Sequence, residues 1–136
     1  MMVFLTRRAS FSASHRLWSD QLTEADNYAM YEKCANPHGH GHNYVLEVTI
    51  QGIPDPRTGM VLNLTDLKHA VNEQVVKWVD HKHLNYDVSW LEGFIPTTEV
   101  LVIKIWERLA DSLPAGMLFE VKLHETENNF ASYRGE

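Results

Sequence analysis

The feature that most constrains this chain is the alternation of residues 40–51. Every second side chain belongs to one face, which begins with two histidines and continues with apolar groups: His40, His42, Tyr44, Leu46, Val48 and Ile50. The residues between them are mostly polar or small. This pattern is typical of a β-strand that buries one side of a sheet and exposes the other. With 136 residues, the chain is expected to form one domain, residues 1–136, around that sheet.

Further elements follow from the same kind of pattern. Residues 3–16 alternate as well, and His15 ends their more apolar face. A turn at 53–59 is expected to join 40–51 to a short strand, residues 60–64, as a hairpin. Apolar spacing and capping residues predict helices. The helices are expected at 65–79 and 96–113, with a short one from residue 23, and two late strands at 117–126 and 130–133.

The predicted order of the main elements is β-β-β-α-α-β-β. Strands at both ends of the chain, with helices between them, indicate an α+β fold. Its expected form is an antiparallel β-sheet with two helices packed on one face. A small sheet of this kind has open edges, which favours association of copies through those edges.

The histidines around residue 40 indicate a metal site. Side chains at i and i+2 on a strand point the same way about 7 Å apart, so two imidazoles can converge on one ion, whereas His38 and His42 lie about 13 Å apart. His40 and His42 are the favoured pair, and His15 supplies a third ligand. Three histidines leave a position open, as in catalytic zinc sites. Cys34 as a fourth ligand would instead make the site closed, hence structural or metal-sensing.

Composition excludes several classes of protein. The net charge of −6 argues against a nucleic-acid partner, and an anionic substrate would need local positive charge. No apolar run reaches the roughly 20 residues of a membrane span, and the N-terminus does not resemble a signal peptide. Cys34 is the only cysteine, so no internal disulfide can form. A single cysteine fits a reducing cytosol, so a cytoplasmic protein is expected.

Several short segments are more specific than these patterns. They are residues 10–17, 34–44, 59–64, 80–82, 96–99 and 125–129. Together, and in this order, they resemble the 6-pyruvoyl-tetrahydropterin synthase family. The resemblance implies the tunnelling fold, in which three copies close a barrel and two trimers stack into a homohexamer. It also implies a Zn²⁺-dependent lyase of tetrahydrobiopterin biosynthesis, which converts 7,8-dihydroneopterin triphosphate into 6-pyruvoyl-tetrahydropterin with loss of triphosphate.

The resemblance also implies roles for individual residues. The zinc ligands would be His15, His40 and His42. The catalytic thiol would be Cys34, a thiolate favoured by nearby cations, and a carboxylate would orient an imidazole that shuttles a second proton. That pair would be Asp80 and His81.

Three more residues match substrate contacts of the family. Glu125 corresponds to the carboxylate that holds the pterin, and Thr97 and Thr98 would lie near the ring. A carboxylate at the end of an apolar strand face needs partners, which the two N–H groups of a pterin amidine edge would supply. Without a ligand, Glu125 would pair with an arginine or with backbone amides.

The chain departs from the family pattern at His38 and Val100. Three residues separate Cys34 from His38 and the His40 that follows it. This spacing resembles the 6-carboxy-tetrahydropterin synthase of queuosine biosynthesis, which is one alternative function. The spacing to His40 and His42 favours the pyruvoyl branch. A catalytically inactive zinc- or pterin-binding module is a third reading. Val100 replaces an expected asparagine and affects only a detail beside the site.

Overall fold

The structure, a computed structural model, describes all of residues 1–136. It is an α+β fold, as predicted. The α-helices and strands follow one another as β1 (Val3–His15), α1 (Glu24–Tyr31), β2 (His40–Gly52), α2 (Leu64–Val71), α3 (Lys77–Val79), β3 (Lys82–His83), α4 (Thr98–Ser112), β4 (Leu118–His124) and β5 (Phe130–Tyr133). Two 3₁₀ turns, η1 (Glu32–Ala35) and η3 (Ser89–Leu91), and one π-helical turn, η2 (Asn72–Val76), complete the chain.

The sheet has the strand order β3-β1-β2-β4-β5. β1 and β2 pair antiparallel along their whole length, from Val3 opposite Gly52 to His15 opposite His40. β4 and β5 extend the sheet, also antiparallel. The two-residue β3, which is too short to show an alternating pattern, adds parallel to the free edge of β1. This register places His15, at the end of β1, beside His40, at the start of β2.

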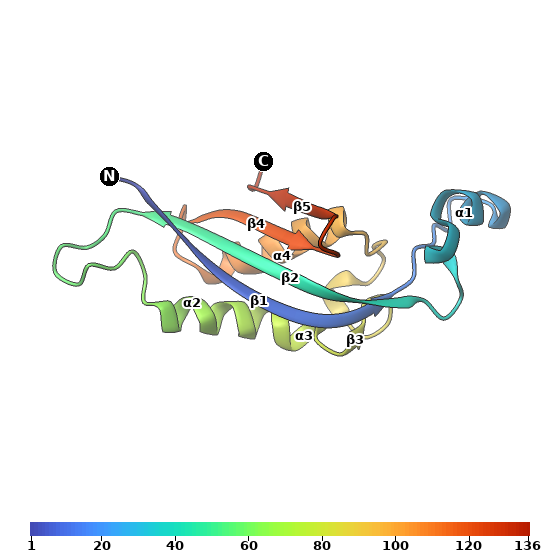
Figure 1. The fold of residues 1–136 in the computed structure, drawn as a ribbon, viewed down its shortest axis with the longest axis horizontal. Coiled ribbons are helices and arrows are strands. Elements are labelled where there is room, and N and C mark those ends of the chain that lie inside the picture. Colours follow the sequence, from blue (N-terminus) through green and yellow to red (C-terminus); the bar gives the residue numbers. More distant parts are fainter.

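The helices cover one face of the sheet. Figure 1 shows α2, α3 and α4 along that face and α1 beyond the end of the β1–β2 pair. The alternation predicted from sequence determines which side chains meet these helices. Phe11, Ala13 and His15 of β1 are buried, and so are Tyr44, Leu46, Val48 and Ile50 of β2. The opposite face carries mainly polar residues, so one side of the sheet remains without a covering layer.

The predicted strand at residues 60–64, and the hairpin it would form with 40–51, are wrong. β2 lies between β1 and β4, so both of its hydrogen-bonding edges are occupied and cannot accept another strand. The segment turns instead at Gly59, whose φ is +74°, and the side chain of Asn63 caps α2 by accepting from the amide of Thr65 at 2.9 Å.

The helix predicted at 65–79 is present but not uniform. It begins at Leu64, widens into the π-helical turn η2, and ends with α3 at Val79. The carbonyl of Gln74 in this turn accepts a hydrogen bond from Arg108 Nε of α4 at 3.0 Å. This contact ties the two helices of the covering layer together.

α1 belongs to a connection that leads from β1 to Cys34. Thr23 caps α1 by accepting from the amide of Asp26 at 3.1 Å. Asn27, which is fully buried, accepts a hydrogen bond from the amide of Ser19 and donates its own amide to backbone carbonyls of the preceding loop. One buried amide thus organises a segment, residues 16–33, in which no other residue is buried. None of the chain's helices is both long enough and apolar enough to span a membrane.

Candidate metal centre and active site

Three histidines converge on the helix-covered side of the sheet. His15 ends β1 directly opposite His40 of β2, and His42 lies two residues further along β2 on the same face. One ring nitrogen from each lies within 4.8 Å of one from each of the others. The spacing argument therefore identified the three residues that come together. His38 is exposed and lies outside this cluster, whereas His40 and His42 both belong to it.

The backbone around His15 prepares its ring as a ligand. Nδ1 of His15 lies 2.8 Å from the carbonyl oxygen of Pro96, which can only accept a hydrogen bond, so Nδ1 carries the proton. Nε2 of the neutral ring is then free to donate its lone pair to a metal. The hydroxyl of Tyr44 lies 3.4 Å from the same Nδ1. Strand alternation places Tyr44 beside the cluster, but no sequence signal pointed to the Pro96 carbonyl.

The distance between His15 and His40 fits a tetrahedral ion. Two nitrogens that each lie about 2.0–2.1 Å from such an ion are about 3.3 Å apart. Nε2 of His15 and Nε2 of His40 are separated by 3.1 Å. Nε2 of His42 is buried and has no hydrogen-bond partner, which is costly unless a ligand occupies it. The three histidines could therefore hold a metal ion through their ring nitrogens.

Two rings of the cluster, those of His15 and His40, resist protonation. Burial is the main cause that lowers the pKa of His15, to about 4, although the Pro96 carbonyl opposes it. Burial also lowers the pKa of His40, and the neighbouring His42 adds to the effect. Both rings are consequently neutral near pH 7, which is the form that binds metals.

Glu125 connects this cluster to the start of α4. Its Oε1 lies 3.6 Å from Nε2 of His42, and its Oε2 lies 4.0 Å from Nε2 of His15. The hydroxyl of Thr98 donates to Oε2 at 2.9 Å. Thr97 instead caps α4, because its hydroxyl accepts from the amide of Val100 at 3.2 Å. Val100, the departure from the family pattern, thus contributes only its backbone here.

A cavity of about 450 Å³ joins the three predicted substrate residues. Thr97, Thr98 and Glu125 all line it, together with apolar groups that include Leu17 and Phe130. A flat heteroaromatic ring needs both an apolar wall and a few convergent polar groups. The cavity offers these beside the histidine cluster.

Cys34 lies in η1, close to this cavity. The amide of Leu17 donates to its carbonyl at 2.8 Å, and Arg16 Nε donates to the next carbonyl, that of Ala35, at 2.9 Å. Partial burial raises the pKa of the Cys34 thiol above its usual value, and the carboxylates of Glu125 and Glu32 raise it further. No cation of the chain is among the groups that shift this pKa.

Arg16 and Asn85 form a positioning unit that sequence reasoning did not identify. The side-chain amide of Asn85 both accepts from the backbone amide of Arg16, at 2.8 Å, and donates to its carbonyl, at 2.9 Å. The guanidinium of Arg16 stacks 4.2 Å from the centroid of Trp18. Because the two contacts join residues 69 positions apart, only the folded chain reveals them.

Asp80 and His81 lie at the free edge of β1. Oδ1 of Asp80 accepts from the amide of Ser12 at 3.0 Å and lies 3.0 Å from Nδ1 of His81. The hydrogen bond from Ser12 is the main cause that lowers the pKa of Asp80, so this carboxylate is ionised near pH 7. His81 has a left-handed φ of 60° and an 82 % exposed side chain. Within one chain, neither residue hydrogen-bonds or ion-pairs with Cys34.

Fold and site together define a small α+β enzyme in which three histidines that could hold a metal ion lie beside a cavity with apolar walls and a few polar groups. The chain belongs to the 6-pyruvoyl tetrahydropterin synthase family, whose model matches residues 4–136. The tunnelling fold implied by the sequence is therefore confirmed for the single chain.

Curated relatives and a solved structure agree with this membership. A 6-pyruvoyl tetrahydrobiopterin synthase of Dictyostelium discoideum is 52% identical over 98% of this chain and 97% of its own length. The Homo sapiens protein of the same name is 48% identical, over 97% of this chain and 91% of its own. The structure of Caenorhabditis elegans 6-pyruvoyl tetrahydropterin synthase superposes with a TM-score of 0.95 at 38% identity, covering 100% of this chain and 97% of that one.

Proposed function

We propose that this chain converts 7,8-dihydroneopterin triphosphate into 6-pyruvoyl-tetrahydropterin and releases triphosphate, in tetrahydrobiopterin biosynthesis. The observation that carries the proposal is the placement of the histidine cluster beside the cavity of Thr98 and Glu125. The reaction needs no external oxidant, because oxidation of the substrate side chain balances reduction of its ring within one molecule. What the protein must supply is binding, orientation and proton transfer.

His15, His40 and His42 are proposed to hold Zn²⁺, with a position left open for the substrate. Bound there, zinc would supply Lewis acidity that makes neighbouring C–H and O–H protons of the substrate easier to remove. The chain's part is to present three imidazoles, one of which has its tautomer set by the Pro96 carbonyl.

Glu125 is proposed to hold the pterin. Its two carboxylate oxygens would accept the two N–H groups of the amidine edge, a bidentate arrangement that is stronger than a single neutral hydrogen bond. Thr98 orients the carboxylate through its 2.9 Å hydrogen bond. Thr97 would keep α4 in place at the rim of the cavity by capping it.

Two groups are proposed to move protons. Cys34, as thiolate beside the bound ion, would take a proton from the substrate side chain and return one. His81 would shuttle the second proton, because the ionised Asp80 orients its Nδ1–H and stabilises the imidazolium that forms.

Because Cys34 and the Asp80–His81 pair do not contact each other in one chain, we propose that they meet between copies. The expected assembly is a homohexamer, a dimer of trimers, in which strand edges associate. Mixing Cys34→Ala with His81→Ala protein after dissociation and reassembly should restore activity at some sites. If no mixture is more active than either variant alone, the shared site is refuted.

The function is tested by incubating purified, zinc-loaded protein with 7,8-dihydroneopterin triphosphate. The expected result is stoichiometric triphosphate release and a product with the mass of 6-pyruvoyl-tetrahydropterin. A product with the mass of 6-carboxy-tetrahydropterin would assign the chain to the other branch of the family. If no triphosphate is released, the chain is a catalytically inactive binding module instead. A reducing compartment such as the cytosol suits the reaction, because it keeps Cys34 as a free thiol.

A further inference from the structure

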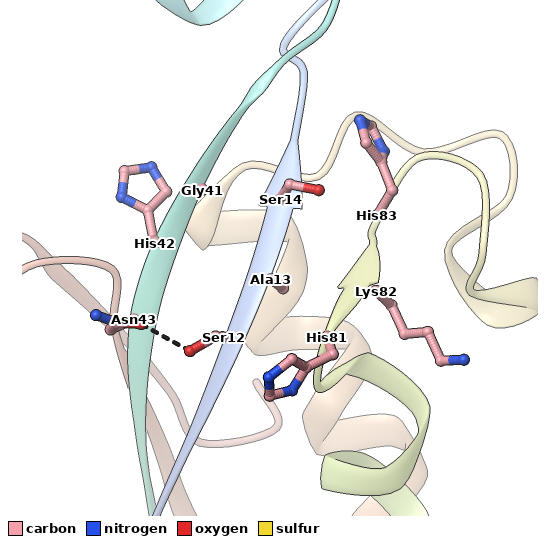
Figure 2. Close-up of a pocket in the computed structure, with 9 residues that line it drawn as sticks. All are labelled: Ser12, Ala13, Ser14, Gly41, His42, Asn43, His81, Lys82 and His83. Atoms are coloured by element: carbon pink, nitrogen blue, oxygen red, sulfur yellow. Dashed lines mark hydrogen bonds between the residues drawn. The ribbon is translucent and has the colours of Figure 1, made fainter.

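A hollow of about 360 Å³ lies on the face of the sheet that no helix covers. It is bounded by β1, by the start of β2 and by β3 at the edge (Figure 2). Ala13 is the only hydrophobic residue in its wall, and none of the residues that line it carries a carboxylate. In a chain with a net charge of −6, a polar hollow without acidic lining is a local exception.

Basic groups gather along the edge of this hollow. Lys82 lines it, is exposed and makes no ion pair. His83 accepts the amide hydrogen of Asn85 at Nδ1, over 3.3 Å, so its neutral ring carries the proton on Nε2. Two carboxylates of the neighbouring chain segments are already engaged. Asp80 accepts from Ser12 and pairs with His81, and Asp87 accepts from the amide of His83 at 2.9 Å.

Uncharged donors face the same space from the strands. Figure 2 shows the hydroxyl of Ser14 pointing from β1 toward β3, and this hydroxyl has no hydrogen-bond partner within the chain. The hydroxyl of Ser12 donates to Oδ1 of Asn43 at 2.6 Å, which leaves the two amide hydrogens of Asn43 free. Separate donors are therefore spread along the hollow from β2 to β3, and the exposed Lys82 follows at the β3 edge.

We propose that this hollow binds an oligophosphate group, namely the triphosphate that the substrate carries and releases. The inference rests on the proposed function and adds the residues that hold the leaving group: Lys82 and Ser14, with Asn43 and His83 at either side. His81 lines the same hollow, so the triphosphate would lie beside the imidazole proposed to move a proton. A chain of phosphates offers many acceptor oxygens and matches several spaced donors better than one carboxylate does. Because the overall charge repels a polyanion, these local donors carry the attraction.

The test measures binding of inorganic triphosphate to the intact, assembled enzyme by calorimetry. Lys82→Gln should raise its Kd about tenfold or more, the usual effect of losing a hydrogen bond to a charged group, and Ser14→Ala should raise it about threefold. Lys68→Gln is the matched control, because it removes the same charge from the exposed surface of α2 and should leave the Kd unchanged. Orthophosphate should bind at least about tenfold more weakly than triphosphate, because it reaches fewer donors.

The proposal is overturned if Lys82→Gln and Ser14→Ala change the Kd no more than Lys68→Gln does. It is also overturned if orthophosphate binds as tightly as triphosphate, since the hollow would then not distinguish an oligophosphate. Binding of inorganic triphosphate requires no turnover, so the result is independent of the proposed reaction. Conversely, the wild-type enzyme could release triphosphate normally while the Lys82→Gln variant binds triphosphate with an unchanged Kd. That result would support the proposed function and refute this inference.

Discussion

Replacing His40 by alanine should remove the metal, whereas replacing His38 should not. The two residues lie two positions apart, carry the same side chain and differ only in where the fold places them. Nε2 of His40 lies 3.1 Å from Nε2 of His15 inside the cluster, and His38 is exposed outside it. The pair therefore forms a matched test of the strand register.

The expected magnitude follows from the number of ligands. His40→Ala leaves two of the three imidazoles, and even residues that only support a ligand cost 10–100-fold in metal affinity when removed. Loss of a ligand should therefore weaken zinc binding by at least about 100-fold, or about 2.7 kcal/mol. His38→Ala should change the affinity by less than about twofold, as is usual for surface substitutions away from special features.

The assay is competition for zinc with a chromophoric chelator, accompanied by circular dichroism to show that both variants fold. His40 is half-buried, so its truncation creates no large core cavity. Loss of zinc from the His38 variant, or retention of full affinity by a folded His40 variant, would show that the assigned register does not hold the metal.

Three further predictions use other parts of the site. Glu125→Gln should keep zinc, because three histidines remain, but should weaken binding of a pterin by about tenfold or more in fluorescence titration; loss of zinc would instead make this carboxylate a ligand. In metal-free protein, His15 of the unfolded chain has its ordinary pKa of 6.5, whereas burial lowers the pKa of His15 in the folded chain to about 4. Between these pH values, the unfolded chain therefore binds a proton that the folded chain does not. The free energy of unfolding should therefore fall by roughly 3 kcal/mol as the pH is lowered from 6.5 to about 4. His15→Gln should make this free energy less dependent on pH in urea titrations. Arg16→Lys keeps the charge but loses the Nε donor to Ala35, so the rate at which iodoacetamide alkylates Cys34 should change while the metal content stays constant; an unchanged rate would contradict the positioning role.

Much of the metal site could be predicted from local sequence because a strand has a period of two. Alternation places His40 and His42 on one face with Tyr44, and it places His15 at the end of the matching face of β1. Once two such strands pair, the histidines have to meet. The capping residues at Asn63 and Thr97 also follow local rules, which is why both helix starts were close to the observed ones.

Other features depend on contacts between distant parts of the chain, and local patterns could not predict them. Residues 60–64 resemble a strand, but they form none because β1 and β4 already occupy both edges of β2. The Pro96 carbonyl that sets the tautomer of His15 is a backbone group 81 positions away and leaves no mark in the sequence.

The sequence by itself determined which residues can bind a metal, because side-chain chemistry and strand periodicity are local properties. Only the tertiary structure decided how the remaining groups are arranged. It places Glu125 beside His42 and Thr98 against Glu125, and it leaves Cys34 and His81 without a contact in one chain. The physical reason is that the pairing order of strands and the packing of α4 on the sheet depend on the whole chain, so the distance between these groups is a property of the fold.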